Sequence, residues 1–316
     1  MKVTQKLLMI LATVCCLGVV SPSWAAPSEE AQANAKAAFK KDQVCTKCHD
    51  ESESAPVLSL YQTKHGVRGD GRTPTCQSCH GESDAHLKVK STPPDVVFKK
   101  GAFSVSDERD RSAQCITCHK GAARNNWDGG VHQMNDVACN DCHKVHKPAD
   151  PVLNKMTQTQ VCYTCHKEQR ADSFKTSTHP IAVGKVVCSD CHNPHGGTGP
   201  KLLKKNTVNE TCFLCHAEKR GPMRFEHQPV VEDCSYCHTP HGSNITPLLK
   251  DRPPLLCADC HDGPHQSKNP FGNNMGGTQS NRNITSPANG AVGRGCMNCH
   301  SLIHGSNSPT GGYFQR

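Results

Sequence analysis

The sequence has few of the residues that normally build a protein core. Leu, Ile, Val and Phe together make up 17% of the 316 residues, and aromatic residues make up 4%. A chain below about 20% in these four residue types usually cannot bury enough apolar surface to fold on its own. This shortage excludes a conventional globular enzyme held together by its own side chains. The abundant residues are 22 Cys and 20 His, so we expect something other than aliphatic packing to fill the protein.

Long apolar runs are also missing, except at the N-terminus. Lys2 and Lys6 precede an apolar segment at 7–20, and Ala25 fits the small-residue rule for an export cleavage site. This apolar segment is too short to cross a bilayer core, which takes about 20 residues. We therefore predict that residues 1–25 are a signal peptide and that the mature protein is exported.

The cysteines beyond this segment follow one pattern. Loss of the signal peptide removes Cys15 and Cys16, and a lipid anchor there is a weaker alternative because Val14 stands where a small residue is wanted. The other 20 cysteines form ten copies of C-x-x-C-H, with none left over. The motifs are Cys45, Cys48 and His49; Cys76, Cys79 and His80; Cys115, Cys118 and His119; Cys139, Cys142 and His143; Cys162, Cys165 and His166; Cys188, Cys191 and His192; Cys212, Cys215 and His216; Cys234, Cys237 and His238; Cys257, Cys260 and His261; and Cys296, Cys299 and His300.

C-x-x-C-H is the attachment signature of c-type haem. Its two thiols bond to the two vinyl groups on one edge of the porphyrin, and the adjacent His reaches the iron from one face. A thioredoxin-like enzyme needs one such pair in a βαβ unit, and zinc sites give no reason for a His after every pair. Disulfides suit an exported protein but do not explain this spacing. The ten motifs therefore predict ten covalently attached haems c.

An equal number of His residues lies outside the motifs. They are His65, His86, His132, His146, His179, His195, His227, His241, His265 and His304. One additional His per haem predicts a second axial imidazole at each iron, so that every site is six-coordinate.

Some of these His residues follow a motif closely, as His146 follows His143. Residues three apart on a helix share one face, with Cβ atoms about 5–6 Å apart, whereas two axial ligands must approach one iron from opposite faces. We therefore predict that His143 and His146 bind different irons and that each His-x-x-His links two neighbouring haems. The spacing leaves open which haem each additional His serves.

The motifs recur in pairs. Each pair consists of one C-x-x-C-H, a His, a second C-x-x-C-H and a trailing His, and three pairs begin at Cys115, Cys162 and Cys212, which lie 47 and 50 residues apart. The last pair departs from this pattern, because each of its motifs has its own trailing His. Such repeats stack into quasi-linear arrays. We predict that residues 26–316 form a single elongated domain of five two-haem repeats.

Local patterns between the motifs are weak. A helix is expected at Ser28–Lys41, which opens with a capping residue and acidic side chains and closes with basic ones. Residues Gln266–Gly295 are rich in Gly, Asn and Ser and predict a long loop. No segment shows the alternation of apolar and polar residues that is typical of a strand. The expected fold is a haem-templated multihaem cytochrome c, mostly irregular with short α-helices and little or no β-sheet.

The charge balance is basic before haem is counted. Without Lys2 and Lys6 the chain has 34 basic and 28 acidic residues, a formal net charge of +6. Nucleic acid is excluded as a partner, because the chain is exported and lacks interleaved aromatics. Ten haems would add about twenty propionate charges and make the loaded protein negative. Several basic residues are candidates for pairing with propionates, or equally for a solvated basic face: Lys201, Lys204, Lys205, Lys219, Arg220 and Arg224.

Residues around the motifs add a more specific signal. The segments at 139–146, 188–196, 215–222 and 296–307 resemble the periplasmic decahaem cytochromes of the MtrA/DmsE type, and the resemblance extends over nearly the whole mature chain. It implies a cytochrome that sits inside an outer-membrane β-barrel porin. Such a protein takes electrons from a periplasmic or inner-membrane donor cytochrome. It passes them to an outer-surface multihaem cytochrome or a terminal reductase in extracellular respiration.

Three functions remain to be weighed. The favoured one is an electron carrier without a substrate site, relaying electrons across the periplasm and outer membrane through a porin, since a polar, irregular chain cannot face lipid itself. A multihaem reductase is an alternative, but it needs an iron with an open position, and every motif here has an additional His to match it. A periplasmic electron-storage cytochrome is the other alternative. The sequence leaves the direction of electron flow and the haem potentials open.

Overall fold

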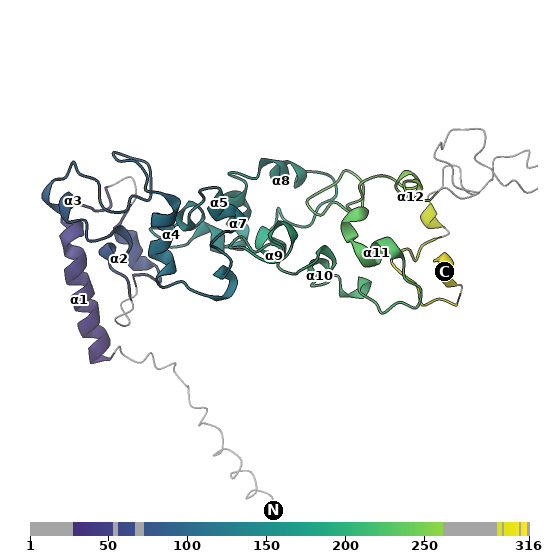
Figure 1. The fold of residues 1–316 in the computed structure, drawn as a ribbon, viewed down its shortest axis with the longest axis horizontal. Helices are drawn as coiled ribbons and strands as arrows, with labels where there is room; N and C mark the ends of the chain where they lie inside the picture. The colour runs from purple at the N-terminus through teal and green to yellow at the C-terminus, as the bar shows by residue number, and fades with distance from the viewer. Residues whose placement is uncertain are drawn as a thin grey trace, which may run out of the picture.

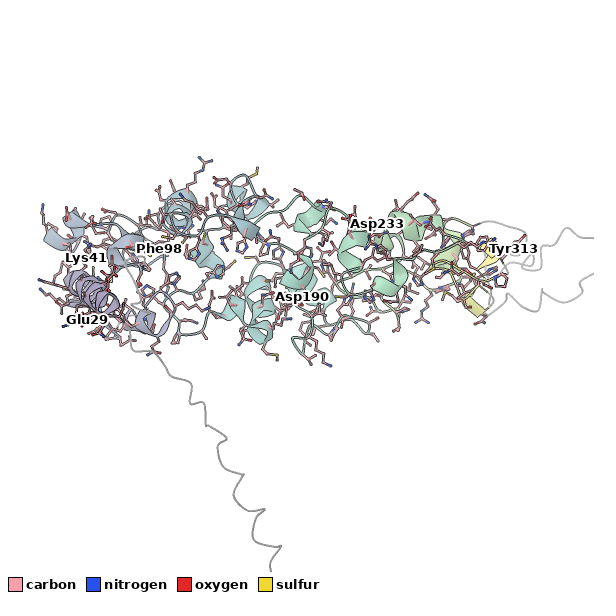
Figure 2. All side chains as sticks on the ribbon, turned by 90° about the horizontal axis from the view of Figure 1, so that it is seen from below. Glu29, Lys41, Phe98, Asp190, Asp233 and Tyr313 are labelled. Carbon is pink, nitrogen blue, oxygen red and sulfur yellow. The ribbon has the colours of Figure 1, made fainter. Side chains whose placement is uncertain are left out.

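The computed structural model is an elongated succession of short helices joined by irregular segments (Figure 1). It describes residues 28–52, 56–66, 73–261, 296–298, 300–309 and 311–314. The predicted signal peptide, the predicted loop Gln266–Gly295, His265 and Cys299 lie outside these residues. The long first helix crosses one end of the molecule, and the chain then advances to the opposite end (Figure 1). Figure 2 shows the same extension, with Glu29 and Lys41 at one end and Tyr313 at the other.

The described residues form twelve α-helices and several 3-10 turns. The α-helices are α1 (Glu29–Thr46), α2 (Cys76–His80), α3 (Asp84–Lys88), α4 (Glu108–Ile116), α5 (Val131–Met134), α6 (Cys139–Cys142), α7 (Lys155–Cys162), α8 (Lys167–Asp172), α9 (Cys188–Cys191), α10 (Val208–Cys212), α11 (Gln228–Glu232) and α12 (Leu255–Ala258). The 3-10 turns are η1 (Leu58–Gln62), η2 (Ala122–Arg124), η3 (Pro151–Leu153), η4 (Pro200–Leu202), η5 (Ala217–Lys219), η6 (Cys234–Tyr236), η7 (Cys296–Asn298) and η8 (Gly311–Tyr313). None of these helices is both long enough and apolar enough to span a bilayer, within the residues that the structure covers.

Pairing of extended backbone segments is confined to isolated β-bridges in the part of the chain that the structure describes. Within the described residues these join Ser177 to Ser243, His192 to Leu203, Phe225 to Ser306 and His238 to Leu249, and none grows into a strand. The expected fold class, short helices in a largely irregular chain with little or no β-sheet, is therefore confirmed.

Helix α1 runs further than its sequence signals indicate. The helix expected at Ser28–Lys41 begins at Glu29 as predicted but continues past the basic residues to Thr46, and so includes the first cysteine of motif 1. Asp42 explains the extension. It is 1% exposed, and its carboxylate accepts hydrogen bonds from the Cys76 backbone N–H at 2.9 Å and the Tyr61 hydroxyl at 2.9 Å. Contact with motif 2, rather than the charge of the last turn, therefore determines how far the helix extends.

The two motifs of each pair occupy opposite ends of their helices. The first motif begins at or near the C-terminus of a helix, as Cys162 does in α7 and Cys212 does in α10. The second motif begins its own helical turn, as Cys139 begins α6 and Cys188 begins α9. The helix of a first motif contacts that of the second motif in the pair α4 and α6 and in the pair α7 and α9. The chain thus brings paired motifs together through their helices.

A buried polar side chain precedes the first motif of four pairs. It lies three residues before the first cysteine, and its relative exposure is 1% for Asp42, 2% for Ser112, 5% for Thr159 and 6% for Asn209. Asn209 makes the fullest set of hydrogen bonds. Its amide donates to the carbonyls of Val230 and Val231 at 2.8 and 2.9 Å, and its carbonyl accepts from the Cys234 N–H at 2.7 Å. One side chain therefore fastens α10 to the start of the next motif.

Apolar burial is slight, as the composition predicts. Among the described residues the buried hydrophobic side chains are Leu60, Val96, Trp127, Ala138, Tyr163 and Val187. Large apolar side chains such as Phe174, Leu153 and Met134 are instead more than two-thirds exposed. These scattered contacts do not form a continuous core.

We predict that Asn209→Ala lowers the free energy of unfolding of the holoprotein by about 3 kcal/mol, because it removes three part-buried hydrogen bonds worth about 1 kcal/mol each. Thermal unfolding followed by Soret circular dichroism measures the change. Asn206→Ala is the matched control, since Asn206 is exposed and its side chain accepts only from the Thr198 hydroxyl; its effect should stay within about 0.5 kcal/mol. Equal effects of the two substitutions would contradict the role given to Asn209.

Candidate haem-binding sites

Among the described residues, nine imidazole pairs run along the molecule. In each pair the His of a C-x-x-C-H motif faces one additional His, with ring centroids 5.8–6.4 Å apart. The pairs are His49 and His86, His80 and His146, His119 and His65, His143 and His195, His166 and His132, His192 and His241, His216 and His179, His238 and His304, and His261 and His227. Nine motif His residues and nine additional His residues are thus brought together one to one.

The separation within each pair fits a shared iron. A metal–imidazole bond of about 2.0 Å, with about 1.1 Å more from nitrogen to ring centre, places two ligand rings on opposite sides of one metal about 6.2 Å apart. The observed distances fall around this value. Buried polar atoms without a partner also fit a bound haem, since Trp127 Nε1 and His146 Nδ1 lack hydrogen bonds among the described residues, and haem carries carboxylates that accept such bonds.

The pairs connect neighbouring repeats in both directions. Within the repeat that begins at Cys115, His132 faces His166 of the next repeat. In return, His195 of the next repeat faces His143. The same exchange joins the following repeats through His179 with His216 and His241 with His192. Motif 1 differs, because His49 faces His86 of its own repeat.

Hydrogen bonds at Nδ1 set the orientation of these rings. His132 Nδ1 lies 2.8 Å from the Pro194 carbonyl, His179 Nδ1 lies 3.0 Å from the Pro240 carbonyl, and His227 Nδ1 lies 2.9 Å from the Ile303 carbonyl. Each acceptor stands directly before the trailing His of the next repeat. Donation from Nδ1–H to a carbonyl fixes the tautomer and leaves Nε2 as the ligand atom.

Glycines after the trailing His residues allow adjacent repeats to dock. Gly196 has φ +105° and Gly242 has φ +151°, both outside the range that side chains favour. A Cβ at Gly196 would overlap the backbone oxygen of Asn126, and one at Gly242 would overlap that of Asp172. Both carbonyls belong to the preceding repeat, so the backbones meet where an imidazole crosses between repeats.

The two rings of a His-x-x-His segment belong to different pairs. His143 faces His195, whereas His146 faces His80, so the two rings belong to different pairs. The second pair involves motif 2, which is two motifs away from motif 4 rather than next to it. The spacing left open which haem each additional His serves, and here the trailing His reaches back across the intervening motif 3.

The cysteines form a second, continuous arrangement. The first cysteines of paired motifs lie in contact, as Cys115 does with Cys139. Second cysteines of successive pairs lie within electrostatic range, as Cys79 does of Cys118. None of the nineteen described cysteines is in a disulfide. The motifs therefore follow one another in space in the same order as in the chain.

Burial favours the neutral form of many of the facing imidazoles. Desolvation lowers the pKa of seven described His residues, which are His65, His80, His146, His195, His227, His241 and His304. The neutral imidazole is the form that binds a metal. The surroundings of these rings thus favour ligation over surface charge.

The remaining predicted residues lie at the far end or on the surface. His300 Nδ1 lies 2.6 Å from the Tyr313 carbonyl, while Cys299 and His265 lie outside the described residues. The candidate propionate partners Lys201, Lys204, Lys205, Lys219, Arg220 and Arg224 are all exposed. Of these, Lys219 pairs with Glu218 at 3.9 Å.

Sequence reasoning missed two groups of residues around the rings. The backbone carbonyls that accept from Nδ1 carry no side-chain signal, although a Pro before the trailing His at 194 and 240 is a hint. Asp150, whose carboxylate lies 2.6 Å from His143 Nδ1, is a single acidic residue with no repeated counterpart. A search for acidic residues shortly after each motif would have found it.

Comparisons with known proteins agree with this arrangement. Residues 179–221 and 227–266 match the doubled CXXCH motif, and residues 76–156 match the NrfB-like cytochrome c-type family. Over 276 residues the chain is 44% identical to the multihaem cytochrome MtrA of Shewanella baltica (strain OS185), covering 86% of this chain and 80% of that protein. This chain belongs to the MtrA family of multihaem c-type cytochromes.

More distant relatives are also c-type cytochromes. The chain is 26% identical over 171 residues to the cytochrome c-type protein NrfB of Escherichia coli O6:H1, covering 48% of this chain and 81% of that protein. It is 22% identical over 215 residues to the high-molecular-weight cytochrome c of Nitratidesulfovibrio vulgaris, covering 67% of this chain and 36% of that protein. Membership of the MtrA family confirms covalently bound haem c and electron transfer.

The ring orientations predict two classes of ferric low-spin EPR signal. The angle between axial imidazole planes sets the splitting of the iron d orbitals, so perpendicular and parallel pairs differ. Three pairs are near-perpendicular at 79–84°: His65 with His119, His80 with His146 and His132 with His166. Five are near-parallel at 6–29°, including His143 with His195.

Single substitutions assign the two classes. His132→Ala should remove intensity from the near-perpendicular class and create one high-spin site, whereas His195→Ala, its matched counterpart, should do so in the near-parallel class. A high-spin signal in the native protein, or carbon monoxide binding to its reduced form, would contradict complete bis-imidazole ligation.

Proposed function

We propose that the protein is a decahaem cytochrome that relays electrons across the periplasm and outer membrane through a porin partner, in extracellular respiration. One observation carries the proposal. Among the described residues, the helices that carry the motifs succeed one another from α1 towards the C-terminal end of an elongated chain (Figure 1), and paired imidazoles accompany each motif for which both rings are described. A carrier over distance needs such a row, whereas a single-site enzyme does not.

The proposed ligands follow from the pairs. Each motif would hold one haem by two thioethers and its own His, and the facing His would bind the opposite side of the iron. The nine facing pairs leave His300 and His265, which we assign to the tenth haem by elimination. On this assignment residues 26–316 form one domain of five two-haem repeats.

In this proposal the chain holds the haem irons in place and does not bind a substrate. When bound, haem would supply an iron that takes up and releases one electron, and the two imidazoles of each pair would hold that iron. Nδ1 hydrogen bonds such as those of His132 and His179 hold the rings in place. Because catalysis at a metal needs an open position, this ligation supports an electron carrier and not an enzyme.

The irregular backbone of the chain supports a barrel partner. A largely irregular chain has backbone groups that lipid cannot satisfy, so a crossing of the outer membrane requires a protein sheath. We infer an exported protein associated with the outer membrane through a β-barrel porin. Its donor would be a periplasmic or inner-membrane cytochrome, and its acceptor an outer-surface multihaem cytochrome or a terminal reductase.

Reconstitution tests the relay. Liposomes that contain the protein in its porin partner and enclose a redox dye should show dye reduction when dithionite is added outside, and liposomes with the porin alone should not. His195→Ala should slow the reduction, because it removes one axial ligand near the middle of the row. Absence of dye reduction, in protein that still takes up about ten electrons, would instead establish electron storage.

A further inference from the structure

One imidazole differs from the others in its hydrogen-bond acceptor. Eight of the described ligand candidates place Nδ1 against a backbone carbonyl at 2.6–3.2 Å: His80, His86, His132, His179, His192, His227, His238 and His300. His143 Nδ1 instead meets a carboxylate, Asp150 Oδ2, at 2.6 Å. The nearest comparison is His216, whose Nδ1 lies 3.7 Å from Glu218 Oε1, beyond hydrogen-bonding distance.

The backbone around Asp150 holds this carboxylate in place. Its second oxygen, Oδ1, accepts from the Lys144 N–H at 3.2 Å and the Val152 N–H at 3.3 Å, and Asp150 caps the η3 turn. Its side chain is only 16% exposed. Two backbone donors therefore occupy one oxygen, and the other is left directed at the His143 ring.

Equivalent motifs in the neighbouring repeats provide internal references. His192 and His238 occupy the same position in their repeats, and their Nδ1 atoms meet the carbonyls of Lys201 and Pro247, both at 2.9 Å. Their ring pairs are also near-parallel, at 29° and 13°, against 6° for His143 with His195. The charge on the acceptor is thus the clearest difference between otherwise similar sites.

A carboxylate acceptor makes the imidazole a stronger electron donor. Charge-assisted hydrogen bonds are shorter and about twice as strong as neutral ones, and a carboxylate behind a ligating His raises the basicity of that ligand. A more basic ligand stabilises the ferric over the ferrous state and lowers the reduction potential. Burial of Asp150 limits screening of this effect by solvent.

Other charges near the site act more weakly. Arg124 interacts electrostatically with His195, which would favour the ferrous state, but its guanidinium Nε donates to the His119 carbonyl at 3.1 Å. Lys144 directs its ammonium at the carbonyls of Asn140 and Asp141. Neither cation contacts the His143 ring, whereas Asp150 does.

We propose that Asp150 is a positioning residue for the site at motif 4, called the fourth site below. It gives the haem bound there by His143 and His195 a lower reduction potential than the haems at His192 and His238. The proposal rests on the ligand assignment made above. In the row, this site would hold an electron less readily than its neighbours and would form an energetic step near the middle of the relay.

The test is potentiometry of the holoprotein followed by EPR. In the wild type, one near-parallel low-spin signal should stay ferric to more negative potentials than the other signals of that class. In Asp150→Asn, which keeps the shape of the side chain but replaces the charged carboxylate by a neutral amide with a single oxygen acceptor, that signal should move upward. We expect at least a tenfold change in the ferric-to-ferrous ratio at a fixed potential, which is 59 mV for a one-electron couple.

Asp141→Asn is the matched control. Asp141 lies in the same motif and bonds to Arg111 and the Ala138 N–H instead of to His143. Its side chain is 42% exposed, so solvent screens its charge. This substitution should leave the midpoint of the fourth site nearly unchanged.

The outcomes separate this inference from the proposed function. An unchanged midpoint in Asp150→Asn, or an equal shift in Asp141→Asn, overturns the role of Asp150 while the low-spin signals still support ligation. Absence of low-spin signals in the wild type overturns the ligand assignment itself. If Asp150→Asn loses haem, the wild-type titration decides, because near-parallel signals that all titrate together refute a distinct fourth site.

Discussion

The facing imidazole pair is the interaction on which the rest of the structure depends. Each pair joins a C-x-x-C-H motif to a His from a distant part of the chain, at a distance that fits one iron between two rings. Crosslinks between distant residues restrict the unfolded chain, and the restriction grows with the length of chain enclosed. A chain with little apolar burial of its own needs stabilisation of this kind, since folding must offset about 1–2 kcal/mol of backbone entropy per residue.

The exchange of His residues between repeats also determines the shape. A repeat gives one imidazole forward and receives one back, so neighbouring repeats cannot separate without breaking two imidazole pairs. The glycines at 196 and 242 and the Nδ1 bonds to the carbonyls of Pro194 and Pro240 fix the approach of one repeat to the next. Repetition of this junction along the chain produces an elongated row of motifs, which is the arrangement that a relay requires. The same contacts that hold the fold therefore order the cofactor sites.

Much of this arrangement could be predicted from the residues, and the parts that could not have physical reasons. The C-x-x-C-H motifs and the matching number of additional His residues predicted haem c and paired ligands, because covalent attachment imposes a local spacing. The partner of each His could not be predicted, since His146 lies three residues from His143 yet faces His80 across an intervening motif. The end of α1 was missed because a buried tertiary contact of Asp42, rather than local charge, extends it. Asp150 was missed because one acidic residue in a turn carries no pattern.

The central claim is that this chain takes its fold from attached haem. Far-UV circular dichroism tests it most directly, by comparing the holoprotein with the same chain made in cells that lack the haem-ligation machinery. The account predicts that the haem-free chain has a largely unfolded spectrum, with most of the helical signal of the holoprotein lost. A haem-free chain with the same helical signal and the same cooperative thermal transition as the holoprotein would contradict it.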